Sequence, residues 1–391
     1  MRIAVVETSP YGGLLHYAYQ LADGLAEGGN DVELIVARNN ELADRPGSAR
    51  MRSILTETVK DRRSPAGLRR GARRASVAVR LSATWTQIVL AVARGRYDAV
   101  VLTCDISPPP AAFGAWLLGA LPGMPRVGFV LHNATVFNRS ARPGLVVEQS
   151  LATRTLEAPL RRFDVVFVHG EQTLHEVEHA HPDLPLAVIP HGDERIFSTK
   201  PPEPSDEERV LFFGNWVRVK GVEVLMAAFD RLLVERPEAK LTIAGQPYPD
   251  EIDLGAVHAW AAGHGERVEI LARYIPLEEV PDLFARSRVV VTPYLIGYQS
   301  GVIHLAMTMA RAVVTSDVGD LAATVVDGET GVVVPPGDPQ ALAAALARVL
   351  ADSELAARLG AAGYERVSRE SSWSTVAQRL GASLDAAAVS S

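Results

Sequence analysis

Short apolar runs alternate with amphipathic segments along the whole chain, and this alternation predicts strands separated by helices. In the segments between the runs, apolar residues recur every three or four positions, as in Leu14–Glu27, where Leu15, Ala18 and Leu25 share one face. Strands that are apolar throughout are typical of parallel sheets with helices on both faces. The expected strands are Ile3–Glu7, Val32–Ala37, Ala99–Thr103, Val127–Leu131, Val165–Val168, Leu186–Ile189, Val210–Phe213, Leu241–Ala244, Val268–Leu271, Val289–Val291, Ala312–Thr315 and Val332–Val334.

The alternating pattern runs twice, which predicts two domains. Between the two runs, Phe197–Glu208 is rich in proline and charge and has no periodicity, so we expect it to link the domains. The predicted fold class is α/β, with two doubly wound, Rossmann-like parallel-sheet lobes facing a central cleft. Residues 1–193 form the first lobe, which a C-terminal helix at 372–391 completes, and residues 194–371 form the second. Ligands of such sheets bind at the carboxyl ends of the strands.

The composition is that of a soluble globular protein: 391 residues, 48% hydrophobic and 22% charged. We see no apolar run of about 18 residues that would span a bilayer. Arg2–Glu7 leads directly into the first strand without a signal-peptide pattern, so a cytoplasmic location is expected. A single cysteine, Cys104, excludes an intramolecular disulfide and a multi-cysteine metal site, and its place after an apolar run favours a packed thiol.

The net charge of −7 is unevenly distributed. Residues 1–190 contain 21 Lys and Arg against 18 Asp and Glu, whereas the remainder contains 18 against 28. Arginines concentrate in Arg45–Arg80, which is compatible with a solvated pair of helices or with peripheral contact of an acidic inner membrane face or an anionic acceptor. Because this stretch has almost no aromatic residues, single-stranded nucleic acid is not an expected partner.

In each lobe, one glycine-containing loop follows the first strand. In the first lobe, Gly12 and Gly13 precede a helix and permit close approach of a ligand, but the dinucleotide pattern GxGxxG is absent. In the second lobe, the loop after Phe213 contains Gly214, Asn215, Arg218 and Lys220, the last two of them cations. It lacks the GK[ST] ending of a P-loop. The first loop therefore gives no support for NAD binding, and the second gives none for ATP hydrolysis.

A helix beginning at Ser300 and Gly301 offers a second anion-binding feature. Unpaired N–H groups at a helix start and the positive end of its dipole suit phosphate, and Val302 adds another N–H group. Together with the cations Lys220 and Arg218, this helix start offers the N–H groups and the positive charge that bind a diphosphate. The alternative interpretation of the helix start is an ordinary turn between a strand and a helix. His132 and His191 follow strands and suit hydrogen bonds to sugar hydroxyls, whereas His169, His175, His179 and His181 are interpreted as structural. No metal-ligand spacing is present, so no metal is expected.

In the order and spacing of its motifs, nearly the whole chain resembles the retaining GT-B glycosyltransferases of the family 4 type. The motifs are Gly12–Gly13, Gly29–Val32, Val188–Gly192, Phe213–Gly221, Leu241–Gly245, Val291–Gly319 and Val326–Pro335. The resemblance implies metal-independent transfer of a hexosyl group from a nucleoside diphosphate sugar, with a UDP or GDP sugar as donor substrate and no permanently bound cofactor. The implied acceptor is a hydroxyl of a glycan, a lipid-linked molecule or a small polyol.

Residue by residue, the resemblance makes Lys220 the diphosphate lysine, His132 the histidine near the donor sugar and Gly13 a glycine near the phosphates. Backbone groups around Arg273 and Tyr274 would contact the base.

This chain also departs from the family pattern. Asn215 replaces an arginine, for which Arg218 would substitute, and the paired glutamates would fall at Gly297 and Leu305. Gln299–Val302 looks like a branch with Gln-Ser-Gly-Val in that place. The alternatives left open are a pseudo-glycosyltransferase or other nucleotide-sugar-binding protein and a nucleotide-sugar 2-epimerase.

Overall fold

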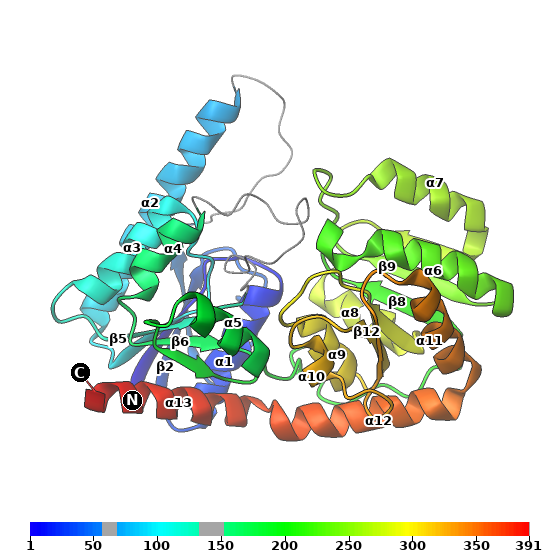
Figure 1. Ribbon diagram of the computed structural model, residues 1–391. Helices are drawn as coiled ribbons and strands as arrows, with labels where there is room; N and C mark the ends of the chain where they lie inside the picture. Colours follow the sequence, from blue (N-terminus) through cyan, green and yellow to red (C-terminus); the bar gives the residue numbers. More distant parts are fainter. Residues whose placement is uncertain (57–68, 133–151, 391) are drawn as a thin grey trace. The chain divides into compact units, whose positions relative to one another are not determined.

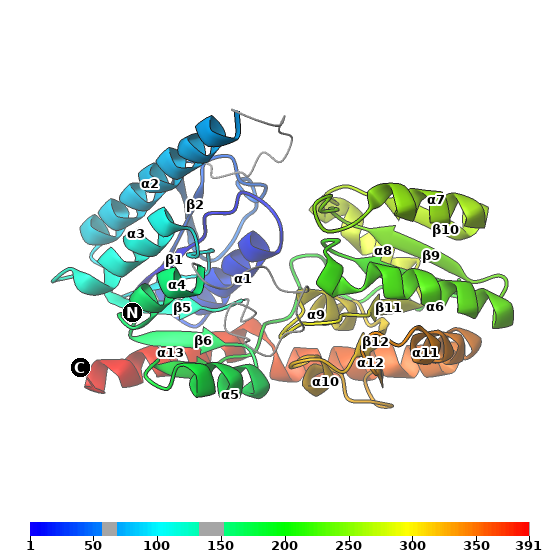
Figure 2. The same ribbon diagram turned by 45° about the horizontal axis from the view of Figure 1, so that its top comes forward.

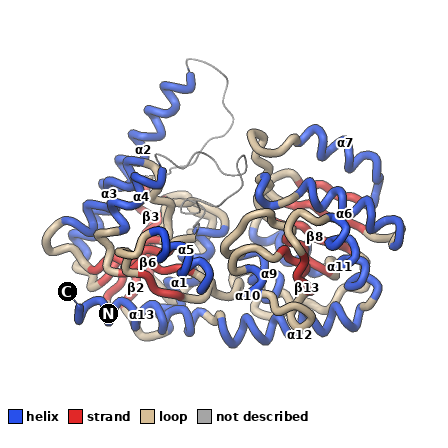
Figure 3. The backbone as a smooth tube through the Cα atoms, viewed as in Figure 1, coloured by secondary structure: helices blue, strands red, loops and turns tan. Residues whose placement is uncertain are grey.

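The computed structural model describes residues 1–56, 69–132 and 152–390, which form two compact units. Unit 1 runs to Pro190 and resumes at Trp373, and unit 2 includes His191–Ser372. The segment Phe197–Glu208, expected as a linker, is therefore part of unit 2. Lys60, Arg62 and Arg63 of the arginine-rich stretch lie outside the described residues. Figure 3 shows strands enclosed by helices in each unit.

The described strands of unit 1 form one parallel sheet in the order β3-β2-β1-β4-β5-β6-β7. Helix α13 packs against α1, where a Cβ on Gly24 would lie only 2.9 Å from Trp373 Cβ. The strands are β1 (Arg2–Val6), β2 (Asp31–Ala37), β3 (Arg50–Leu55), β4 (Ala99–Leu102), β5 (Arg126–Val130), β6 (Val165–Val168) and β7 (Leu186–Val188). The helices are α1 (Gly13–Glu27), α2 (Arg69–Gly95), α3 (Pro109–Ala120), α4 (Ala152–Leu160), α5 (Glu171–Ala180) and α13 (Trp373–Ser390).

Strand β3 was not expected from the sequence, and it corrects the interpretation of Arg45–Arg80 as a solvated pair of helices. It begins with Arg50, Met51 and Arg52 and lacks a continuous apolar run, and it pairs with β2 at the edge of the sheet. Arg50 and Arg52 form ion pairs with Glu33 of β2 at 3.6 and 3.4 Å. Cross-strand charge pairs of this kind stabilise an edge strand without the continuous apolar run that marks a central one.

Helix α2 lies beside α3, and its N-terminal turns project beyond α3 (Figures 1 and 2). By length and composition alone, its segment Ala75–Gly95 is apolar enough to cross a membrane, so the expectation that no such run exists is wrong. Trp85, Ile88 and Val92 of this helix are nevertheless buried in unit 1. Other apolar residues nearby are exposed, among them Val79 at 68% and Phe113 of α3 at 62%.

Unit 2 contains a second parallel sheet, whose described strands have the order β10-β9-β8-β11-β12-β13. The strands are β8 (Arg209–Phe213), β9 (Lys240–Ala244), β10 (Val268–Leu271), β11 (Val289–Thr292), β12 (Ala312–Ser316) and β13 (Val332–Val334). The helices are α6 (Val222–Glu235), α7 (Leu254–His264), α8 (Val280–Ala285), α9 (Gly301–Thr308), α10 (Leu321–Thr324), α11 (Pro339–Ala351) and α12 (Ser353–Glu370), with 3₁₀ turns η2 (Arg218–Lys220), η3 (Gly265–Arg267) and η4 (Leu277–Glu279).

Both faces of the unit 2 sheet are buried, which explains why its strands are apolar without alternation. Val289 and Val291 of β11 pack into one apolar cluster with α6 and α11, and Val290 between them packs into a second cluster with α8 and α9. Core packing therefore fixes β11, and with it the loop that leads into α9.

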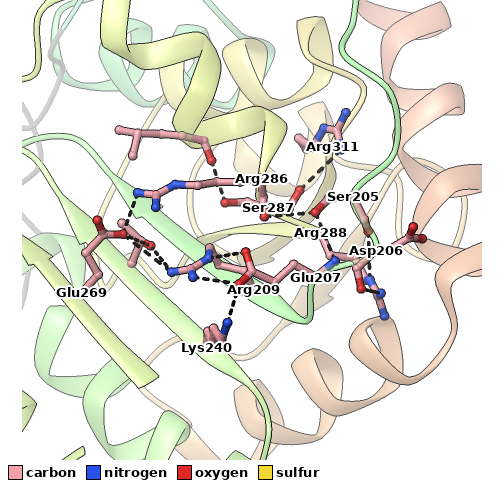
Figure 4. Close-up of polar contacts among 12 residues, drawn as sticks. Ser205, Asp206, Glu207, Arg209, Lys240, Glu269, Arg286, Ser287, Arg288 and Arg311 are labelled. Atoms are coloured by element: carbon pink, nitrogen blue, oxygen red, sulfur yellow. Dashed lines mark hydrogen bonds and ion pairs between the residues drawn. The ribbon is translucent and has the colours of Figure 1, made fainter. Parts of the chain in front are cut away.

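A polar network joins the amino ends of the unit 2 strands (Figure 4). Arg209 is 8% exposed; it donates to Glu207 at 2.8 Å and to Thr242 at 2.9 Å. Lys240 lies 2.8 Å from the same glutamate. Buried Arg311 donates to the carbonyls of Pro202 and Glu203 at 2.5 and 2.6 Å, and burial lowers its pKa to about 10. These contacts attach residues 202–209 to unit 2.

Replacing Glu207 by Gln should lower the free energy of unfolding at neutral pH by roughly 1–3 kcal/mol, because hydrogen bonds to charged groups are lost. Hydrogen bonding from Arg209, with that from Lys240, lowers the pKa of Glu207 from 4.5 to about 2. The carboxylate's contribution is thus complete above pH 4.5 and is lost as the pH falls toward 2.

Urea unfolding of both proteins between pH 7 and 3 measures this difference, which should shrink with acid. Exposed Glu238→Gln is the control and should show a small difference at every pH. A Glu207→Gln effect that stays constant with pH would show that the carboxylate charge is not involved.

Candidate functional site

Three side chains from two loops meet at the start of α9 in unit 2. Lys220, on the η2 turn after β8, places Nζ 3.5 Å from the centroid of the Tyr294 ring. The Tyr294 hydroxyl lies 3.2 Å from the hydroxyl of Ser300, the residue preceding α9. Tyr294 and Ser300 are buried, and Lys220 is half-buried. A cation, a phenol and a hydroxyl are thus held at a helix N-terminus, where an anion is stabilised.

Close backbone contacts hold these loops together. The N–H of Leu295 donates to the carbonyl of Val219 at 2.8 Å, which ties the loop after β11 to η2. Gly221 has φ 72°, and a Cβ there would lie 2.0 Å from the carbonyl oxygen of Pro293. Because only glycine fits such a conformation and contact, Gly221 sets the position of the neighbouring Lys220.

The start of α9 also faces an imidazole and a carboxylate from the loop after β7. A Cβ on Gly301 would lie 3.2 Å from His191 Cε1 and 3.4 Å from Glu194 Oε1. Glu194 is 7% exposed, and its backbone N–H donates to Thr308 Oγ1 of α9 at 3.0 Å. The His191 ring lies 4.8 Å from that of His304, whose pKa burial lowers to about 4. His304 is therefore neutral at pH 7.

In unit 1, the glycine loop before α1 already contacts an acid of the chain. The N–H of Gly12 donates to Glu41 Oε1 at 2.6 Å, and the same oxygen lies 2.6 Å from His16 Nε2. Gly12 has φ 85°, which favours glycine. Neither Glu41 nor Glu194 was identified from the sequence, because each reaches its helix start across a long stretch of chain.

His132 lies in unit 1, two residues after the end of β5. Its Nδ1 is 3.4 Å from Nε2 of His169, a residue interpreted from the sequence as merely structural. Tyr17 packs edge-on against the His132 ring, with centroids 4.5 Å apart. Cys104 is buried, and burial raises the pKa of its thiol well above its usual range.

The other sequence-predicted residues take different positions. Gly214 directly follows β8, and a Cβ there would lie 3.5 Å from Val302 Cγ2, so Gly214 lies beside the first turn of α9. Asn215 and Arg218 are exposed, and the Arg218 N–H donates to Glu251 at 3.3 Å.

Arg273 pairs with Glu279, which raises the pKa of Arg273. Its guanidinium is thus bound to a carboxylate of the chain, and Tyr274 beside it is half-buried.

Comparison with known proteins identifies the C-terminal part of the chain. Residues 207–352 match the model of the family described as Glycosyl transferases group 1. We refer to the matched residues 207–352 as the group 1 domain. The chain is also 32% identical, over 203 residues, to the phosphatidyl-myo-inositol mannosyltransferase of Mycolicibacterium smegmatis. That match covers 49% of this chain and 50% of the relative, so it spans half the relative's length.

Solved structures match the whole described fold. A sucrose-phosphate synthase from Thermosynechococcus elongatus aligns with TM-score 0.76 and 21% identity, covering 100% of both chains. Anabaena HepE, solved in complex with UDP and glucose, aligns with TM-score 0.72 and 16% identity, covering 98% of this chain and 99% of the other. The predicted GT-B fold of two Rossmann-like lobes is thereby confirmed.

Within the group 1 domain, neither position expected for the paired glutamates suits an acid. Leu305 is 3% exposed in the apolar cluster around α9, where a carboxylate would be costly to bury. At Gly297 a Cβ would lie 3.3 Å from Tyr294 Cδ2 and 3.6 Å from Leu321 Cδ1.

Replacing Gly221 by Ala should destabilise the group 1 domain by about 1–3 kcal/mol, because alanine would be strained at φ 72° and would clash with Pro293. The expected result is a lower Tm by differential scanning calorimetry. Gly263→Ala in α7 is the matched control: its Cβ would meet nothing within 4 Å, so it should leave the Tm unchanged or raise it. Equal effects of the two substitutions would argue against the close contact at Gly221.

Proposed function

We propose that this chain is a retaining hexosyltransferase that uses a nucleoside diphosphate sugar as donor. The observation that carries the proposal is the cluster of Lys220, Tyr294 and Ser300 at the start of α9 in a glycosyl transferases group 1 domain. The donor is a UDP or GDP sugar, and the complex of Anabaena HepE with UDP and glucose supports this choice. The acceptor is a hydroxyl of a glycan, a lipid-linked molecule or a small polyol.

The proposed reaction takes place on one face of the sugar. The bond from the anomeric carbon to the diphosphate breaks, and a bond to the acceptor oxygen forms on the same side, so the configuration is retained. The acceptor proton passes to a diphosphate oxygen. Lys220 and the N–H groups of Gly301 and Val302 stabilise the negative charge of the leaving group, so the reaction needs no metal ion. Exposed Arg218, on the same turn as Lys220, is the second cation.

In this scheme Glu194 binds hydroxyls of the donor sugar and so takes the place of the absent paired glutamates. Its carboxylate is positioned against α9 by its own backbone bond to Thr308 and lies beside the Gly301 backbone. A carboxylate at a helix start is favoured by the helix dipole. It would also repel a phosphate placed too close, which restricts the diphosphate to the Lys220 side of the helix start.

Replacing Lys220 by Ala should lower kcat/KM for sugar transfer by roughly 10²–10³-fold, the usual effect of removing one donor to a developing charge. Affinity for the nucleoside diphosphate, measured by calorimetry, should fall as well. Lys200→Ala is the control, since Lys200 is exposed and lies in the segment before β8. Unchanged kcat/KM in Lys220→Ala would remove Lys220 from the mechanism.

The alternatives differ in their products. A transferase releases nucleoside diphosphate and increases the mass of the acceptor. A 2-epimerase changes the donor sugar without an acceptor, and a pseudo-glycosyltransferase binds the nucleotide sugar without transferring the hexosyl group. Mass spectrometry of donor and acceptor after incubation separates the three.

We further propose that the face formed by α2 and α3 contacts a membrane surface containing anionic lipid, on the cytoplasmic side. Exposed apolar Val79 and Phe113 supply hydrophobic contacts, and exposed Arg80, next to Val79, supplies positive charge. Apolar groups flanked by arginine suit an interface of acyl chains and acidic headgroups.

The chain should co-sediment with phosphatidylglycerol vesicles at low salt and be released at high salt, because the attraction is screened. Val79→Asp should weaken this binding, whereas Val234→Asp, at a position 84% exposed on α6, should not. Equal binding to uncharged phosphatidylcholine vesicles, or no effect of Val79→Asp, would refute the membrane contact.

A further inference from the structure

The aromatic ring of Tyr294 is fixed by the packing of unit 2. Tyr294 lies two residues after the end of β11, is 1% exposed and belongs to the apolar cluster around α8 and α9. A Cβ on Gly297 would lie 3.3 Å from Tyr294 Cδ2, so the ring occupies space that a side chain at position 297 would need. The hydroxyl at the other end of the ring lies 3.2 Å from that of Ser300. Contacts at both ends therefore restrict the ring to one orientation.

The ammonium group of Lys220 lies over the face of this ring. Its Nζ is 3.5 Å from the ring centroid, and the described residues form no ion pair with it. Lys240 in the same unit differs, because its Nζ lies 2.8 Å from the Glu207 carboxylate. An aromatic ring attracts a cation but is itself neutral, so it does not cancel the charge as a carboxylate would. The ammonium has three donors, and a ring on one side leaves donors on the other side.

We propose that Tyr294 is a positioning residue, which holds the Lys220 ammonium at the start of α9 in the place where it binds an anion. That the anion is the diphosphate of a sugar nucleotide rests on the proposed function. A free lysine side chain loses many rotamers when it binds a ligand, and the ring removes part of this cost beforehand. Because the ring is neutral, the phosphate oxygens need not displace a carboxylate from the ammonium.

The contact can be measured without any assay of transfer. The lysines of the chain are Lys60, Lys200, Lys220 and Lys240, so ¹³C-lysine-labelled protein gives few ε-methylene signals, and Lys220→Ala assigns one of them. Protons over the face of a ring are shielded. The Lys220 signal should therefore lie upfield of that of exposed Lys200 and approach it in Tyr294→Leu. Tyr294→Phe retains the ring and should retain the shift.

Calorimetry with UDP, GDP and inorganic pyrophosphate tests the positioning role. Tyr294→Leu should weaken the binding of these anions by about 5- to 10-fold, as expected for loss of a cation–π contact, and kcat/KM for transfer should fall by a similar factor. Tyr294→Phe should stay within about 3-fold, because it loses only the contact with Ser300. The control is Tyr364→Leu, at a half-buried position on α12, which should change neither the affinity nor the Lys220 signal.

The upfield shift of Lys220 should persist in the complex, since the anion binds the ammonium on the side away from the ring. An unshifted Lys220 signal in the unmodified protein, or an unchanged one in folded Tyr294→Leu, would overturn the proposal. Loss of the shift on binding, or equal losses of affinity in Tyr294→Phe and Tyr294→Leu, would also overturn it. If the shift is present but none of the three anions binds, the proposed function fails instead, and the contact of Lys220 with Tyr294 is only structural.

Discussion

Contacts between backbone atoms at the carboxyl ends of the unit 2 strands are the constraint on which the candidate site depends. A Cβ on Gly245, after β9, would lie 1.9 Å from the carbonyl oxygen of Gly214, and one on Gly319, after β12, would lie 2.0 Å from that of Gly297. Gly221 makes the corresponding contact with Pro293. All three have φ between 51° and 137°, so conformation and space both require glycine. The loops can therefore approach closely enough for Lys220 to reach Tyr294.

Most of the fold follows from the sequence, because buried parallel strands are apolar throughout and so stand out from the helices around them. Strand β3 does not, since its arginines are stabilised by Glu33 of a neighbouring strand and not by burial. At the site, Lys220 and Ser300 are predictable because each occupies a loop directly after an apolar strand. The approach of Glu41 to Gly12 and of His169 to His132 is not, because residues 29 and 37 positions apart meet only through sheet order.

In each unit a carboxylate of the chain lies beside a glycine at a helix start that was expected to receive phosphate. Glu41 accepts from the Gly12 N–H, and Glu194 lies beside Gly301. The two helix starts differ, however, in what else is present. At the start of α9, Lys220 contacts the ring of Tyr294, whose hydroxyl lies beside that of Ser300. At the start of α1, Glu41 is instead paired with His16. A diphosphate is thus better matched to the group 1 domain, and neutral hydroxyl groups are better matched to the glycine loop of unit 1.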